Sequence, residues 1–383
     1  MKPYQIGVIV FSTILTFSAL YAPQPLQPLL MEEFGVSQER SALLTTVTML
    51  PLGLAPIVYG YMLESFSSRR LLRFALLALA VLQFLFFLSP SFNVLIILRF
   101  FVGLAIPAVL TSLMTYISNM SEKGNVQRLM AFYISSTIMG GFAGRFFSGL
   151  IAATLGWRMN FLSLSIALLL SFFLTASLHE AELKVSKFSP AAVIEVIKRR
   201  RFGAVYLLIF ATFFMFAALL NFLPFRMREL NEASSSLTIG VMYTGYIMGI
   251  VMSLNSLRIV RFLGGEMRTV FTALSFYCLT LFFFTFDSVA VMFAGMFFFC
   301  CCMFLAHSVA SGYLNKIAED RKGITNGLYV SFYYIGGTLG SILPGFVYSG
   351  FGWKVFLLSI GLVMASAVVI GRITLGRLYY NDL

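Results

Sequence analysis

Long apolar runs separated by short polar stretches dominate the chain and predict its helices. A helix needs about 20 residues to cross a bilayer core of about 30 Å, and twelve apolar runs of this kind occur. The predicted membrane helices span residues 4–26, 42–63, 71–90, 94–117, 127–153, 157–178, 203–225, 236–259, 268–286, 289–313, 323–349 and 353–376. The pattern therefore predicts an all-α membrane protein.

The glycine and tryptophan pattern repeats once, with a constant offset of 196 residues. The segment from Tyr133 to Trp157 reappears from Tyr329 to Trp353 without a gap. Glycines at 140, 141, 144, 149 and 156 fall on glycines at 336, 337, 340, 345 and 352. A fixed offset of this kind indicates an internal repeat, so we expect a duplicated chain.

The repeat predicts two six-helix halves. We expect an N-terminal half over 1–184, a basic cytoplasmic linker over 185–202 and a C-terminal half over 203–383. Composition agrees, since 59% of the residues are hydrophobic and 11% are charged, whereas soluble domains have about 25% charged residues. The expected fold is an all-α membrane protein with 12 transmembrane helices arranged as two six-helix repeats.

The chain has a net charge of +12, and its basic residues are distributed unevenly between the two sides of the predicted membrane. With both termini cytoplasmic, 20 of the 27 lysines and arginines lie on the inner side, 5 lie outside and 2 lie within the membrane. Cytoplasmic loops carry such an excess, so the charge predicts orientation and gives no reason to expect nucleic-acid binding. The first apolar run is too long for a signal-peptide core, and we expect it to remain as a helix. All 4 cysteines lie in predicted membrane helices and indicate no disulfide framework.

The loop after the second predicted helix contains a recognisable arrangement of polar residues. Gly60 is followed by an acid four residues later, Glu64, and then by the basic pair Arg69 and Arg70. This arrangement resembles the loop signature of the major facilitator superfamily. The match is partial, because serines stand at 65, 67 and 68 where the family has a basic residue, a glycine and another basic residue. The resemblance implies that Gly60, Glu64, Arg69 and Arg70 take part in gating.

Further motifs resemble the same superfamily. Arg99 and Gly103 match its Arg-x-x-x-Gly signature in the predicted helix over 94–117. The glycines at 140, 144 and 149 resemble the glycine-rich signature of its bacterial drug and proton antiporter branch, with Arg145 where that branch has a proline. The segments Ala306 to Ser311 and Tyr333 to Gly337 resemble its sugar-efflux and drug-efflux group.

The resemblance implies a secondary active transporter whose two halves rock around a site near the middle of the membrane. It also implies a proton-coupled efflux permease that acts as a monomer in a bacterial inner membrane, with a small-molecule substrate and no cofactor. An enzyme is not expected, because the sequence has no nucleotide-binding glycine loop beside a lysine and no paired carboxylates in the predicted helices.

Arg99 and Arg145 are the two charges at predicted membrane depth, and no carboxylate lies there to pair with them. Ionisable residues inside a membrane are costly and are functional by default. Three interpretations are open. The arginines bind an anionic group of the substrate, they donate hydrogen bonds to backbone carbonyls, Gln24 or Tyr21, or the glycine-rich packing holds one of them. Without an intramembrane carboxylate, His307 and Arg99 are the candidates for proton coupling.

Aromatic hydroxyls are the other candidate ligands. Tyr329 and Tyr333 lie one turn apart, and Tyr243 and Tyr246 are expected to share a face of the helix over 236–259. Such rings suit an amphiphilic ligand, and packing between helices explains each of them equally well. The ordinary pKa of a histidine side chain is about 6.5, so His307 can change charge near neutral pH and carry a proton. A structural role with hydrogen bonds to the imidazole is the alternative.

The helix over 289–313 carries a competing signal. Met292, Met296, Cys300, Met303 and His307 follow one helical face, and thioether, thiolate and imidazole groups suit Cu(I). Methionines packed in a membrane protein explain the same stripe. The main hypothesis is an efflux permease for a small amphiphilic organic compound, an anionic one where the two arginines bind it beside the four tyrosines. The alternative is a transition-metal transporter for Cu(I).

Overall fold

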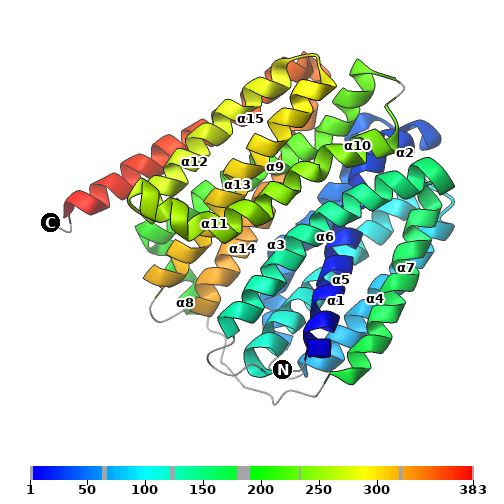
Figure 1. Cartoon of the computed structure of the whole chain (residues 1–383), viewed down its shortest axis with the longest axis horizontal. Coiled ribbons are helices and arrows are strands. Elements are labelled where there is room, and N and C mark those ends of the chain that lie inside the picture. The colour runs from blue at the N-terminus through cyan, green and yellow to red at the C-terminus, as the bar shows by residue number, and fades with distance from the viewer. Residues whose placement is uncertain are drawn as a thin grey trace. The chain divides into compact units, whose positions relative to one another are not determined.

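The computed structural model describes residues 3–62, 67–120, 126–178, 190–232, 234–318 and 322–381. These residues form two compact units: unit 1 comprises residues 1–188 and 233–244, and unit 2 comprises residues 189–232 and 245–383. The described ranges contain helices and turns but no strand (Figure 1). The predicted all-α class is confirmed.

Unit 1 combines helices of the N-terminal half with one short helix from the C-terminal half. Its elements are α1 (Pro3–Tyr21), η1 (Gln24–Leu26), α2 (Gln27–Phe34), α3 (Gln38–Met62), α4 (Ser68–Leu88), α5 (Phe92–Met120), α6 (Val126–Leu155), α7 (Trp157–Leu174), η2 (Thr175–Ser177) and α10 (Ser236–Met242).

Unit 2 contains the remaining helices. They are α8 (Pro190–Lys198), α9 (Arg200–Leu230), α11 (Ile247–Leu263), α12 (Glu266–Thr280), η4 (Leu281–Thr285), α13 (Val289–Ile317), α14 (Lys322–Gly340) and α15 (Leu343–Asn381). The 3-10 turn η3 (Tyr243–Tyr246) joins α10 to α11 where the two units meet in the sequence. Within the predicted linker, residues 190–198 form α8, and residues 185–189 lie outside the described residues.

Within the described residues, 10 helical stretches are long and apolar enough to cross a membrane. The last stretch, Ile324–Leu375, covers the final two predicted helices. The predicted helix over 42–63 corresponds to α3 up to Met62, its last residue lies outside the described residues, and α3 is not one of the 10 stretches. Each of the twelve predicted segments overlaps helix among the described residues, with bounds that differ by a few residues.

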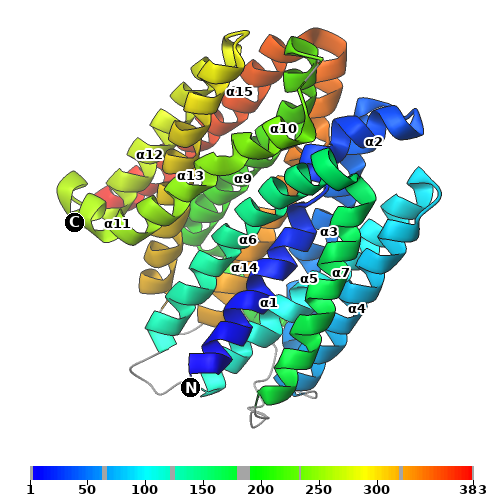
Figure 2. The same ribbon diagram turned by 45° about the vertical axis from the view of Figure 1, so that its right-hand side comes forward.

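The sequence repeat is also a repeat of helix packing. α1 lies along α6 in unit 1, as Figures 1 and 2 both show, and α9 lies along α14 in unit 2. A β-carbon added at Gly144 would lie 2.5 Å from the Cα of Ser18, and one at Gly340 would lie 2.1 Å from the carbonyl oxygen of Phe214. Ser18 and Phe214 are themselves 196 positions apart. The repeated glycines let the paired helices approach closely.

The repeated Gly-Trp pair marks a second shared feature, a break between two helices. Gly156, between α6 and α7, has a φ of 88°, and Gly352, inside α15, has a φ of 81°. Both values lie in the region that glycine adopts without a steric penalty. The tryptophans that follow are anchored, because Trp157 donates to the Glu33 carboxylate and Trp353 donates to the carbonyl of Phe284 at 2.6 Å.

Candidate functional site

Arg99 lies fully buried in α5 and donates hydrogen bonds to three backbone carbonyls. Its Nε donates to Leu44 at 3.0 Å, its Nη1 to Ala19 at 2.8 Å and its Nη2 to Leu20 at 2.5 Å. α1 ends just before Pro23, and a proline has no amide hydrogen for the carbonyl four residues earlier. That carbonyl is the one of Ala19. Arg99 therefore supplies the missing donor at the broken end of α1.

The equivalent place in unit 2 has neither the proline nor the arginine. Adding 196 to positions 23 and 99 leads to Leu219 and Gly295. α9 runs without a break through Leu219, so no carbonyl is left without its helical donor there. This comparison favours the interpretation in which Arg99 donates to backbone carbonyls. Roles of Arg99 in substrate binding and proton coupling stay predictions.

Arg145 lies in α6 with 1% of its surface exposed. Its Nε donates to Oε1 of Gln24 at 2.6 Å, and its Nη1 donates to the carbonyl of Gly141 at 2.6 Å. The guanidinium carbon lies 3.9 Å from the ring centre of Tyr21 and 5.1 Å from that of Tyr243. Both distances lie within the range of about 6 Å for cation–π attraction. One amide and two aromatic rings thus surround the charge.

An unused donor lies beside this charge. The Nε2 of Gln24 is buried and has no hydrogen-bond partner among the described residues, while its Oε1 accepts from Arg145. A buried polar group without a partner costs about 1–3 kcal/mol. A ligand oxygen placed here would accept from the amide and lie next to the guanidinium. The arrangement suits a carboxylate or another anionic oxygen group.

α10 packs closely on α6 next to Arg145. A β-carbon at Gly149 would lie 2.3 Å from the carbonyl oxygen of Ser236, and one at Gly240 would lie 3.1 Å from that of Arg145. Tyr243, directly after α10, is fully buried. The glycines therefore bring Tyr243 over the guanidinium. Within unit 1, Tyr243 and α10 cover Arg145 on this side.

Tyr243 and Tyr246 stand at the two ends of the 3-10 turn η3, and not in the continuous α-helix expected over 236–259. Tyr246 packs in unit 2, with its ring centre 5.6 Å from that of Phe216 and 5.3 Å from that of Phe304. The two tyrosines of this pair thus belong to different environments.

A second cluster of predicted residues comes together in unit 2. The hydroxyl of Tyr329 lies 2.9 Å from Nδ1 of His307 and donates to the carbonyl of the same histidine at 3.1 Å. The rings of Tyr333 and His307 are 5.0 Å apart, and Tyr333 stacks on Phe213 at 3.6 Å. A tyrosine hydroxyl has one hydrogen. The two contacts can be hydrogen bonds at the same time only if Nδ1–H of His307 donates to the Tyr329 hydroxyl. In that tautomer, Nε2 of His307 carries no hydrogen and can accept a proton.

The sulfur stripe of α13 lies in the interior of unit 2. Met292, Met296, Cys300 and Met303 are all fully buried, and the Cys300 thiol lies 3.8 Å from the Met296 sulfur. Among the described residues, no group of three or more His, Cys, Asp and Glu side chains is placed to hold a metal ion. The copper hypothesis stays a prediction.

The predicted gating motif is only partly described. Gly60 lies in α3, whereas Glu64 lies outside the described residues. Arg69 donates to the carbonyl of Ala176 at 2.6 Å. The amide of Arg70 donates to the Ser67 side chain, which begins α4. A gating role for these four residues stays a prediction.

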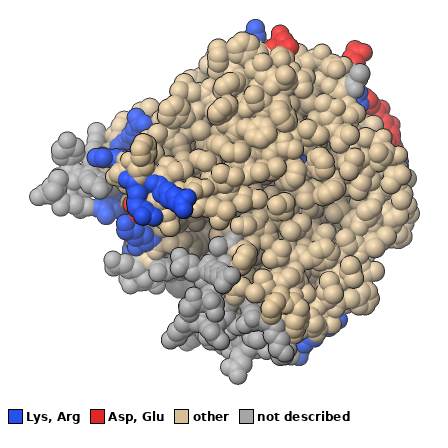
Figure 3. Space-filling model, viewed as in Figure 1, with Lys and Arg blue, Asp and Glu red and all other residues tan. Residues whose placement is uncertain are grey.

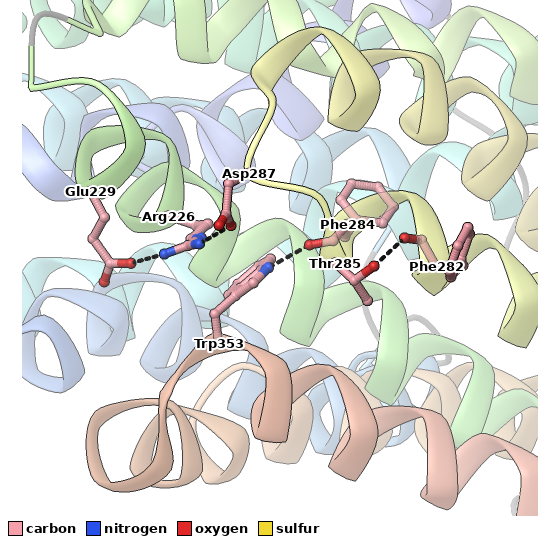
Figure 4. A network of polar contacts seen from close by, with 7 residues as sticks. All are labelled: Arg226, Glu229, Phe282, Phe284, Thr285, Asp287 and Trp353. Carbon is pink, nitrogen blue, oxygen red and sulfur yellow. Dashed lines mark hydrogen bonds and ion pairs between the residues drawn. The ribbon is translucent and has the colours of Figure 1, made fainter.

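Ion pairs that were not predicted from the sequence form at helix ends in each unit. In unit 2, Arg226 lies between Glu229 and Asp287, as Figure 4 shows, at 2.8 Å and 2.5 Å. In unit 1, Arg158 pairs with Glu33 at 2.8 Å. The signal was present, since Glu33 and Glu229 are 196 positions apart. These pairs hold helix ends together in each unit.

Comparison with known proteins places the chain among membrane transporters. Residues 9–336 match the family model described as Major Facilitator Superfamily. The chain is 30% identical over 349 residues to the uncharacterized MFS-type transporter YybF of Bacillus subtilis (strain 168), covering 88% of this chain and 85% of that protein. It is 26% identical over 378 residues to the inner membrane transport protein YnfM of Escherichia coli (strain K12), covering 96% and 89%.

Solved structures agree on the fold. The nucleoside transporter NupG superposes with a TM-score of 0.81 at 11% identity, covering 97% of this chain and 98% of that one. A bacterial homolog of the human lysosomal transporter Spinster, in an inward-facing and occupied conformation, gives 0.73 at 14% identity, covering 98% and 96%. These likenesses confirm the predicted fold of twelve membrane helices in two six-helix repeats, and the family model and the relatives confirm the resemblance drawn from the motifs.

Proposed function

The chain belongs to the major facilitator superfamily and is a secondary transporter in the membrane, and we propose that it exports a small amphiphilic, anionic organic compound. We place it in a bacterial inner membrane, as a monomer with both termini cytoplasmic. The excess of basic residues in the predicted inner loops supports this orientation.

The observation that carries the substrate class is the Arg145 site. A guanidinium, the free amide hydrogens of Gln24 and the faces of Tyr21 and Tyr243 lie together in a buried place. Donors of this kind bind an anionic oxygen group strongly, because charge-assisted hydrogen bonds are about twice as strong as neutral ones. The aromatic faces suit the apolar part of the same ligand. An anionic amphiphile satisfies both features.

Access to this site requires movement. Arg145 is buried beneath Tyr243 and α10, and α10 is followed by the 3-10 turn η3 rather than by continuous α-helix. We propose that η3 lets α10 separate from α6, which uncovers the guanidinium on one side of the membrane. Closure returns Tyr243 to the charge. This step is one half of an alternating-access cycle.

Coupling to protons is proposed to run through His307. The proposal rests on Nδ1 held by Tyr329 and on Nε2 left as an acceptor. No carboxylate lies within the predicted helices to serve instead. A histidine is the side chain whose charge changes most readily near neutral pH. Uptake of a proton at Nε2 would add a positive charge to unit 2 at one stage of the cycle.

A ligand screen tests the substrate class. Purified protein in neutral detergent is melted with long-chain carboxylates and sulfonates, cationic amphiphiles, sugars and Cu(I), and the series is repeated on Arg145→Gln. A ligand at about 100 times its Kd stabilises the native state by about 2.7 kcal/mol, which a melting curve resolves. Lys354→Gln is the matched control, since it removes an exposed positive charge elsewhere.

We expect an anionic amphiphile to stabilise the wild type and Lys354→Gln but not Arg145→Gln, and to be exported from inverted vesicles only by the first two. Stabilisation of Arg145→Gln to the same extent would remove Arg145 from the site. Stabilisation by Cu(I) alone, lost in Met303→Ala, would replace the proposal with the copper alternative.

A further inference from the structure

One end of unit 2 carries a concentrated basic surface. Figure 3 shows lysine and arginine side chains gathered where Figure 1 places the ends of α11, α12 and α15, beside the C-terminus, while most of the visible surface is uncharged. The described basic residues here are Arg258 and Arg261 near the end of α11, Arg268 near the start of α12, Lys316 near the end of α13 and Arg372 in α15. We call this group the α11 basic surface.

The two arginines of α11 in this surface have no acidic partner among the described residues. Arg258 donates to the side-chain oxygen of Asn255 at 3.2 Å, and the Nε of Arg261 donates to the carbonyl of Leu257 at 3.4 Å. The nearby acid Glu266 is taken by Lys316 at 2.8 Å. Both arginines are exposed and stand three residues apart, so they point to the same side of the helix. Their charges are available to an external anion.

Large apolar side chains are exposed along the same stretch of α11. Leu254 is 71% exposed, Leu257 is 73% exposed and Phe262 is 88% exposed. Along the helix, the leucines come first, the arginines follow, and the phenylalanine stands at the end. From Leu254 to Arg261 the helix rises by about 10 Å, and the headgroup region of one leaflet is about 5–8 Å thick, so the leucines can lie beside acyl chains while the arginines reach the headgroups. The order is apolar and then basic, as a lipid is apolar and then anionic.

We propose that the α11 basic surface binds an anionic glycerophospholipid in the leaflet on the side of the C-terminus. Arg258 and Arg261 contact the phosphate-bearing headgroup, Leu254 and Leu257 contact the acyl chains, and Phe262 lies at the interface. The excess of basic residues in inner loops explains the sign of the charge. It does not explain why two arginines without an acidic partner among the described residues stand in one stripe with exposed leucines. This binding does not depend on the identity of the transported compound.

Lipid titration of the purified full-length protein tests the proposal. Binding of phosphatidylglycerol, phosphatidylethanolamine and phosphatidylcholine is followed by native mass spectrometry in a neutral detergent, for the wild type and for Arg258→Gln/Arg261→Gln. The control is Arg40→Gln/Lys354→Gln, which removes two positive charges outside this surface. Basic residues near an anionic lipid surface strengthen binding through charge attraction. The loss of two of them is expected to weaken phosphatidylglycerol binding about 30-fold. The control should bind like the wild type.

A thermal melting curve without lipid shows whether each variant is folded. If the glutamine variant is not folded, Arg258→Lys/Arg261→Lys replaces it, because this variant keeps both positive charges. Glycerol 3-phosphate separates a lipid site from a site for free phosphate, and Phe262→Ser tests the apolar part. The proposal holds if diacyl phosphatidylglycerol binds more tightly than the neutral lipids and Phe262→Ser weakens it. Equal binding of all three lipids, unchanged phosphatidylglycerol binding by the glutamine variant, or competition by glycerol 3-phosphate at equal concentration would overturn it.

Discussion

Arg99 donates a hydrogen bond to the carbonyl oxygen of Ala19, the oxygen that Pro23 leaves without an amide donor. Replacing Arg99 with Gln would leave the carbonyl of Ala19 without this donor, whereas the carbonyl of Leu44 still accepts from the Thr48 hydroxyl at 2.9 Å. Since an unsatisfied buried group costs about 1–3 kcal/mol, we expect the free energy of unfolding to fall by about that amount. Thermal unfolding of the purified protein measures the change.

The double variant with Pro23→Ala is the matched control for this prediction. Alanine at position 23 supplies an amide hydrogen to the carbonyl of Ala19, so the double variant should lose less stability than the two single changes summed. Purely additive losses would show that the arginine does not act through the broken helix end.

The helices and their pairing could be predicted from the sequence, because apolar runs and repeated glycines are local signals. Gly144 and Gly340 share an offset of 196, and the structure gives each the same kind of close contact. The break between Tyr243 and Tyr246 could not be predicted, because it depends on distant packing. A β-carbon at Gly245, in that turn, would lie 2.8 Å from the Met296 side chain, and no local pattern encodes this neighbour.

The candidate site was predictable in its residue types but not in its contacts. A buried charge in an apolar run marks Arg145 as unusual, and Gln24 was among the partners expected from its polarity. The pairing of His307 with Tyr329 was not expected, although each was a candidate, since periodicity gives the face of a helix and not the neighbour across it. The structure supplies that neighbour.

Substituting alanine at Gly144 or Gly340 should separate the paired helices. The added carbon would lie 2.5 Å from Ser18 in one case and 2.1 Å from Phe214 in the other, so backbone must shift. Overpacking of this kind costs about 1–3 kcal/mol, and we expect both variants to melt at lower temperature than the wild type. Gly7→Ala is the control, because nothing lies within 4 Å there and alanine favours a helix by about 1 kcal/mol. An equal effect at all three positions would contradict the packing explanation.

Removing the ring of Tyr243 should uncouple α10 from Arg145. The guanidinium carbon lies 5.1 Å from this ring, and a desolvated cation–π contact contributes about 2 kcal/mol. A single cysteine replaces Ser148, which lies near Arg145 on α6, in a background without the 4 native cysteines. We expect Tyr243→Leu to increase the labelling of this cysteine by a water-soluble thiol reagent. Tyr243→Phe keeps the ring and should behave like the parent protein. Equal labelling in the leucine and phenylalanine variants would show that the ring does not hold α10 closed.

Proton coupling through His307 predicts a specific loss of pH response. Binding of the stabilising amphiphile to wild-type protein should change the amount of bound protons, measured with an indicator dye in weak buffer between about pH 5 and 8. His307→Ala should bind the amphiphile without this change, and Tyr329→Phe, which removes the partner of Nδ1, should alter its pH dependence. Tyr206→Phe is the matched control, since that hydroxyl donates to the carbonyl of Thr325. An unchanged proton response in His307→Ala would exclude the histidine from the proton path, and Arg99 would be the candidate to test next.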